Sequence, residues 1–398
     1  DPEHPAYPET VEKTATRTLW KLADLSHNRI IRCTIMQDDY PTLLAAPVPP
    51  PEPIAKVMDV EEQIDAENGV RVYRGQLREP AMDAFRDLKN ALPPNIVPMI
   101  RADRDRIAIV LMPRVVEEAR MERRSSGFVP LLLFFATLVT TTVAGAAQSG
   151  VNLLRHPEQF TAGLPYALAL MAILGTHELG HYFAARYHRQ NVTLPYFIPA
   201  PFSLGTFGAF IRMKSPPENR IALFDVAVAG PLAGLVMAIP ALYFGLQSSE
   251  IVSRTSLETL QGTMRPSIAM SYLIHTTLGD AIKTGDVLRL SPMAFAGWLG
   301  LLLTGLNLMP IGQLDGGHTA RAMFGTRVGT YISYLAMALL AFAAFTVAPH
   351  LMFWAFIVFL MGARGVPPLN DVTPVTPGRF AIGVMTFAIF VLIMIPAF

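Results

Sequence analysis

The chain has 398 residues, of which 52% are hydrophobic and only 16% are charged. Soluble domains carry about a quarter charged residues, so this composition argues against a wholly soluble protein. The net charge is +1, from 32 Lys and Arg against 31 Asp and Glu, and it gives no basis for a nucleic-acid partner. The chain begins with Asp1 rather than Met, so we expect its natural N-terminus to lie further upstream.

Charged residues and prolines concentrate in the first 125 residues, which predicts two segments outside the membrane. Residues 1–54 end in the run APVPPPEP (46–53), which is typical of an extended linker, so we expect a leader and a Pro-rich linker there. Residues 55–125 are predicted to form a small α+β domain on the cytoplasmic side. Its periodicities predict one helix, 80–92, and the strands 70–77, 96–102 and 106–113.

The remainder of the chain, 126–398, is dominated by apolar runs long enough to cross a hydrocarbon core of about 30 Å. It is predicted to be a transmembrane domain, so the fold class is a mainly α, polytopic helical membrane protein. The run 350–363 is short, so we expect six to seven spans; another run, 267–278, is too short to cross. The candidate spans are 128–147, 165–187, 222–246, 292–310, 330–348, 350–363 and 380–397.

Positive residues orient the spans, because cytoplasmic loops carry an excess of Lys and Arg. Alternation of the spans places thirteen on the side of the N-terminal domain and five on the other, so this domain is predicted to face the cytoplasm or the equivalent organelle compartment. The thirteen are Arg114, Arg120, Arg123, Arg124, Arg186, Arg189, Arg212, Lys214, Arg220, Arg321, Arg327, Arg364 and Arg379; the five are Arg155, Arg254, Arg265, Lys283 and Arg289.

At span boundaries, His188 is expected to be solvated and Asp225 and Asp371 to be interfacial polar residues.

The motif HELGH (177–181) lies inside the second predicted span. Helical rise puts His177 and His181 on one face, where both imidazoles can bind one metal ion, and Glu178 can accept a proton from water there. Ionisable groups are costly inside a bilayer and are rarely present there without a function. We therefore favour a metal site over a polar pair satisfied by neighbouring helices.

A second polar segment, NLMPIGQLDGGH (307–318), places Asp315 near membrane depth. A catalytic zinc site commonly has three protein ligands, and two histidines with one carboxylate are a known set. Gly316 and Gly317 would let the backbone turn sharply beside it. Asp315 is equally suited to cap the helix that follows, and the residues alone leave both interpretations open.

Three motifs in order, HELGH, FDVAVAGPLAG (224–234) and NLMPIGQLDGG (307–317), resemble the site-2 protease family of intramembrane zinc metalloproteases. The likeness is greatest to the bacterial and plastid branch typified by the EGY-type proteins. It extends from about residue 70 to the C-terminus and includes PYFIPAPFSLGTFGAFIRMKSP (195–216) and PPLNDVTPV (367–375). No insert similar to a PDZ domain is apparent.

The resemblance implies that His177, His181 and Asp315 bind one zinc ion and that Glu178 is the general base. Asn307 matches a position thought to contact substrate or the oxyanion, although a helix–helix hydrogen bond is an equal alternative. Further positions match two other elements of the family. One is a membrane-associated β-hairpin, which could pair with substrate or merely shield the metal. The other is a helix that packs near the site. These positions are Gly205, Phe207 and Gly208 in the hairpin, and Gly230, Pro231 and Gly234 in the helix, where Pro231 is expected to introduce a local break.

These inferences predict an intramembrane zinc metalloendopeptidase that cleaves single-span membrane proteins, located in a bacterial inner membrane or a plastid membrane. Two alternatives belong to other classes. A metal or proton transporter also needs intramembrane His, Glu and Asp, but no internal repeat is visible. An inactive scaffold relative would be expected to have lost a ligand or the base, and HELGH and LDGG are both intact.

Overall fold

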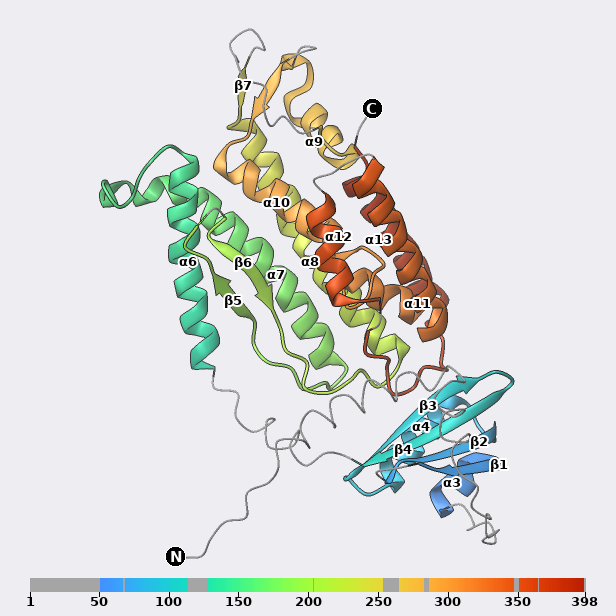
Figure 1. Ribbon diagram of the computed structural model, residues 1–398. Helices are drawn as coiled ribbons and strands as arrows, with labels where there is room; N and C mark the ends of the chain where they lie inside the picture. Colours follow the sequence, from blue (N-terminus) through green and yellow to red (C-terminus); the bar gives the residue numbers. More distant parts are fainter. Residues whose placement is uncertain are drawn as a thin grey trace, which may run out of the picture. The chain divides into compact units, whose positions relative to one another are not determined.

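The computed structural model describes residues 51–66, 69–113, 127–202, 204–252, 265–282, 286–346, 351–363 and 365–396 (Figure 1). The chain divides into two units, of which the first contains Asp1–Arg114 with Leu369–Val372 and the second contains Val115–Pro368 with Thr373–Phe398. Most of the predicted leader and linker, up to residue 50, lies outside the described residues, as does the predicted domain boundary at residue 125.

The first unit is built on a four-stranded antiparallel sheet with the strand order β1-β2-β4-β3. The strands are β1 (Met58–Asp65), β2 (Arg71–Leu77), β3 (Ile96–Asp103) and β4 (Arg106–Pro113), and two helices, α3 (Glu52–Val57) and α4 (Ala81–Ala91), accompany them. Phe85 and Leu88 of α4 are buried against Ile100 and Ile109 of the sheet. The three strands and the helix correspond to the predicted ones, whereas β1 was not predicted, because its polar sequence MDVEEQID hides the alternation.

A short segment from late in the chain, Leu369–Val372, extends this sheet at strand β3. The amide of Ile100 donates to the carbonyl of Leu369 at 2.8 Å, and the amide of Asp371 donates to the carbonyl of Ile100 at 3.1 Å. Asn370 is fully buried and its Nδ2 donates to the carbonyl of Ala81 at 2.9 Å. Asp371 thus lies in the segment that extends the sheet of the first unit, and its predicted place at a membrane interface stays a prediction.

The second unit contains five helices that are long and apolar enough to cross a membrane. They are α6 (Phe128–Gln148), α7 (Leu164–Tyr187), which follows the 3-10 helix η2 (Pro157–Gly163), α8 (Arg220–Gln247), α11 (Asp315–Thr346) and α13 (Pro377–Met394). The predicted spans 292–310 and 350–363 correspond to the shorter helices α10 (Pro292–Asn307) and α12 (Met352–Met361). At 1.5 Å per residue, the 16 residues of α10 reach only about 24 Å. The predicted non-crossing run is the 11-residue helix α9 (Ile268–Leu278).

Helices α7 and α8 pack closely at small residues (Figure 1). A Cβ atom on Gly180 would lie 2.5 Å from the carbonyl oxygen of Ala229, so a larger residue there would force the two helices apart. Leu170 and Leu242 belong to the apolar core that these helices share with α10. Helix α8 runs through Pro231 without interruption, so the predicted local break was wrong.

A β-hairpin lies beside α6 and α7 (Figure 1) and consists of β5 (Tyr196–Pro199) paired with β6 (Thr206–Phe210). Two hydrogen bonds attach the start of β6 to the helices. Thr140 Oγ1 donates to the carbonyl of Gly205 at 2.6 Å, and the Tyr166 hydroxyl donates to the carbonyl of Leu204 at 2.9 Å. A second small ribbon pairs β7 (Glu250–Val252) with β8 (Val287–Arg289), and a short 3-10 turn, η4 (Gly279–Ala281), follows α9.

Polar residues at the ends of the long apolar helices interact with one another. Arg379 of α13 forms a bidentate pair with Asp225 of α8 at 2.7 and 2.8 Å, and His188 Nε2 lies 2.8 Å from the same carboxylate. The expectation that His188 is solvated was therefore wrong. Arg220 and Arg321, both counted among the loop charges, are buried inside the second unit.

Candidate metal centre

Helix α7 carries both histidines and the glutamate of HELGH on buried positions. His177, Glu178 and His181 are each only 7% exposed. The spacing of four residues puts the two imidazoles one turn apart, with Nε2 of His177 and Nε2 of His181 separated by 3.1 Å. Helix α7 thus presents two nitrogen atoms that point at the same small volume.

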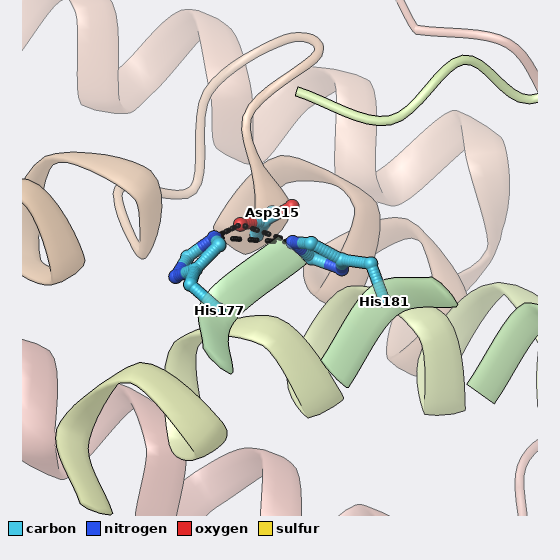
Figure 2. A group of neighbouring side chains, drawn as sticks. All are labelled: His177, His181 and Asp315. Carbon is cyan, nitrogen blue, oxygen red and sulfur yellow. Dashed lines mark hydrogen bonds and ion pairs between the residues drawn. The ribbon is translucent and has the colours of Figure 1, made fainter. Parts of the chain in front are cut away.

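Asp315 is the first residue of α11 and completes the cluster (Figure 2). Its Oδ2 lies 3.5 Å from His177 Nε2 and 3.4 Å from His181 Nε2. The chain reaches this position after α10 ends and winds through an irregular segment, 308–314. Asp315, His177 and His181 together form a group able to hold a metal ion.

The three ligand atoms fit a tetrahedral metal. Ligands bound at about 2.0–2.1 Å in a tetrahedral zinc site are about 3.3 Å from one another, and the observed separations are 3.1, 3.4 and 3.5 Å. Two imidazole nitrogens and one carboxylate leave the fourth position open, as catalytic zinc sites require.

The backbone carbonyl of Val226 in α8 sets the tautomer of one histidine. His181 Nδ1 lies 2.7 Å from this oxygen, which can only accept, so Nδ1 carries the proton and Nε2 keeps its lone pair. A carbonyl has no sequence signature, so this interaction could not be predicted from the motifs.

Two glycines of α8 make room for the imidazole rings. A Cβ atom on Gly230 would lie 2.1 Å from His181 Nε2, and one on Gly234 would lie 3.2 Å from His177 Nδ1. The sequence suggested that these glycines permit helix packing near the site. The structure shows what packs against these glycines, because the groups that approach them are the imidazole rings of the predicted ligands.

Glu178 and Asn307 lie at the edge of the ligand cluster. The carboxylate of Glu178 accepts a hydrogen bond from the backbone of Ile211, just after β6. Asn307, the last residue of α10, has its Nδ2 3.3 Å from His177 Nε2. Both predicted residues are therefore brought to the predicted metal site.

The predicted hairpin residues divide into two kinds. Gly205 is a packing residue, because its φ is +78° and a Cβ atom would lie 2.5 Å from Cα of Thr141 in α6. Phe207 is 67% exposed, and Gly208, with φ +98°, has open space where a side chain would project. Only the latter two lie on an accessible part of β6.

Residues 165–348 match Peptidase family M50. The rice protein (Oryza sativa subsp. indica) named probable zinc metalloprotease EGY2, chloroplastic, is 29% identical over 351 residues, which cover 85% of this chain and 63% of that protein. The Arabidopsis thaliana protein of the same name is 27% identical over 353 residues, covering 85% of this chain and 62% of the relative. The probable zinc metalloprotease EGY1, chloroplastic, of Oryza sativa subsp. japonica is 32% identical over 244 residues, covering 59% of this chain and 41% of the relative.

The chain thus spans less than two thirds of the length of these relatives. No solved structure matches it. The family match includes HELGH, both glycines of α8 and the segment that carries Asp315. Residues 165–348 are thus similar to peptidase family M50, and the relatives found are named zinc metalloproteases of the EGY type, which agrees with the resemblance that the motifs predicted.

Proposed function

We propose that the protein is a zinc-dependent endopeptidase that hydrolyses peptide bonds of membrane-spanning proteins. One observation carries this proposal: His177 Nε2, His181 Nε2 and Asp315 Oδ2 converge at separations of 3.1–3.5 Å inside a domain of apolar helices. Such a group is rare and costly among membrane-spanning helices unless it serves a function.

The proposed mechanism assigns one role to each polar residue. Bound zinc would supply a Lewis acid that polarises a peptide carbonyl and lowers the pKa of water. Glu178 takes the proton of the attacking water and then gives it to the leaving amine nitrogen, so the carboxylate is regenerated. Asn307 is suited to donate a hydrogen bond to the carbonyl oxygen as negative charge develops there.

Strand β6 is the proposed docking site for the scissile segment. Strand β5 pairs with one edge of β6, and within the described residues the sheet ends at the other edge. A substrate helix must unwind before cleavage, because its carbonyls are held in internal hydrogen bonds, and an unwound segment can pair with an exposed strand edge. The amide of Ile211 joins this strand to Glu178, which would place the paired segment beside the base.

The proposed setting is a lipid bilayer with six to seven spans, in which α10, α12 or both supply the spans beyond the five long helices. The membrane domain would occupy 126–398 and the domain 55–125 would face the cytoplasm or stroma. The chloroplast in the names of the relatives favours a plastid membrane, and a bacterial inner membrane is the equivalent site. Single-span proteins are the expected partners, with no role for nucleic acid.

The test uses the purified full chain in proteoliposomes with a model single-span substrate. We expect Glu178→Gln to retain zinc and lose cleavage, and His181→Ala or Asp315→Asn to lower the zinc content as well. Glu158→Gln is the matched control, because Glu158 lies exposed on η2. Full cleavage by Glu178→Gln would refute the assigned base. Zinc transport into the vesicles without cleavage would favour a transporter, and zinc binding with neither activity would favour a scaffold.

A further inference from the structure

Arg321 is a buried cation close to the candidate metal centre. It lies on α11, six residues after Asp315, and its side chain is fully buried. Burying a charged group without compensating hydrogen bonds costs several kcal/mol in general. A guanidinium in this place therefore calls for a specific set of partners, and these partners indicate what it does.

The guanidinium points back toward the segment that precedes Asp315. Arg321 Nη2 donates to the carbonyl oxygen of Gly312 and lies 3.1 Å from Nδ1 of His318. Two glycines leave space for the side chain. A Cβ atom on Gly329 would lie 2.5 Å from Cγ of Arg321, and one on Gly365 would lie 2.0 Å from Nη2.

The peptide units around Gly312 are held from two sides. The amide of Gly312 donates to Ser333 Oγ at 3.3 Å, while its carbonyl accepts from Arg321. Gly312 has a φ of +51°, and a Cβ atom there would lie 2.1 Å from the carbonyl oxygen of Gly362. Residues 308–314 form turns rather than a helix, so these side-chain bonds add to the few backbone bonds of the segment, such as the one from the amide of Leu314 to the carbonyl of Ile311 at 3.0 Å.

Gly312 precedes Asp315 by three residues. A shift of the Gly312 carbonyl therefore moves the start of α11, and metal sites tolerate deviations of only about 0.2 Å in ligand distance. Neither Arg321 nor Ser333 belongs to the cluster of possible metal ligands. Both act on the same residue of the turn, one on each of its backbone polar groups.

We propose that Arg321 is a positioning residue that fixes the carboxylate of Asp315 for metal binding by holding the carbonyl of Gly312. The inference rests on the proposed function, because it takes Asp315 to be a metal ligand. Arg321 does not touch the metal or the substrate; it orients the backbone from which the third ligand projects. Outer residues that orient metal ligands typically contribute ten- to hundredfold to metal affinity.

The test measures metal binding without activity. The metal-free full chain in detergent is titrated with Co²⁺, and visible absorption reports both the affinity and the coordination geometry. We expect Arg321→Met to weaken Co²⁺ binding by about ten- to hundredfold and Arg321→Lys to recover part of the loss, because Lys keeps the charge without the planar fork. Arg327→Met is the matched control, because Arg327 is an exposed arginine on the same helix, and its Co²⁺ affinity should stay within about twofold of wild type.

A double-mutant cycle separates positioning from general stabilisation. If Arg321 acts through Asp315, Arg321→Met should cause no further loss of Co²⁺ affinity in the Asp315→Asn background. If Arg321→Met does not fold, Ser333→Ala removes the other bond to Gly312, and we expect about a fivefold loss, the equivalent of one hydrogen bond.

Each failure has a distinct meaning. Wild-type Co²⁺ affinity and spectrum in Arg321→Met, with Asp315→Asn weakened, would overturn the role of Arg321 and leave the proposed function intact. An equal loss from Arg321→Met in both backgrounds would also overturn it, because the effect would not pass through Asp315. Wild-type binding by Asp315→Asn would instead overturn the ligand assignment and the proposed function with it.

Discussion

Gly230 offers a direct test of the metal centre, because any side chain there must displace a predicted ligand. A Cβ atom at this position would lie 2.1 Å from Nε2, 2.4 Å from Cε1 and 2.5 Å from Cδ2 of His181. The ring cannot simply rotate away, since Nδ1 is held at 2.7 Å by the carbonyl of Val226. Gly230→Ala therefore pushes the imidazole out of its place.

The size of the displacement follows from the contact distances. Ordinary contact begins at 3.4 Å, so an atom that stands 2.1 Å from the new Cβ must move by about 1.3 Å. Zinc sites tolerate about 0.2 Å in ligand distance, so His181 would be lost as a ligand. We expect the zinc affinity of Gly230→Ala to fall by at least about a hundredfold, more than the ten- to hundredfold typical of an outer residue.

The assay is zinc content by elemental analysis, together with cleavage and thermal unfolding of the metal-free protein. The unfolding measurement tests whether the variant is still folded. Ala has a higher helix propensity than Gly by about 1 kcal/mol, so the variant should lose zinc without losing the helix. Gly175→Ala on α7 is the matched control, since a Cβ there meets only Phe197 at 3.8 Å. Full zinc content and full cleavage in Gly230→Ala would refute the ligand role of His181.

Three further predictions concern other contacts of the fold. Asp225→Asn removes the bidentate partner of Arg379, and we expect the free energy of unfolding to fall by about 2 kcal/mol in denaturant titrations; an unchanged midpoint would contradict this. Asn370→Ala should make the amide of Ile100 exchange faster with deuterium, because the segment that covers it loses two hydrogen bonds of Asn370. Unaltered exchange would mean that the segment is held without this side chain. Removal of zinc with a chelator should lower the thermal unfolding temperature, since at a hundredfold excess of free metal over the dissociation constant the metal contributes about 3 kcal/mol; identical melting with and without metal would argue against a bound ion.

Much of the fold follows from local periodicity. The long helices coincide with apolar runs, and α4, β2, β3 and β4 coincide with their patterns, because each element buries one face that its own sequence encodes. The docking of Leu369–Val372 on β3 depends on a pairing across more than two hundred and fifty residues, which no local pattern reveals. The run 350–363 likewise gives only the short helix α12, because apolar composition alone does not fix where a helix ends.

The predicted ligands differ in how far the sequence could determine them. His177 and His181 are related by helical spacing, so one local rule places both rings on one face. Asp315 lies more than a hundred residues later, and the residues alone left it between a ligand and a helix cap. It is in fact both near the imidazoles and at the first position of α11. Arg321 was counted as a loop charge, because burial by backbone carbonyls has no signature in composition.

Helix α8 contributes none of the three ligands, but it contacts both imidazole rings and the helical segment that Asp315 begins. Its Val226 carbonyl orients His181, and its two glycines receive the imidazole rings. At its first turn, Arg220 donates through Nε to the carbonyl of Ala322 at 2.8 Å and through Nη2 to the carbonyl of Met323 at 2.6 Å. These carbonyls end the first segment of α11, just before the helix breaks at Gly325 with φ +84°.

A cation at a helix C-terminus satisfies carbonyls that have no partner within the helix. Arg220 therefore fixes one end of the helical segment that Asp315 begins, while Arg321 fixes the turn before the other end. The two histidines are aligned with α8 by packing, and the aspartate is aligned with α8 by a buried guanidinium. Because each ligand is also placed against α8, the triangle of ligand atoms does not depend only on the contacts that join His177 and His181 of α7 to Asp315 of α11.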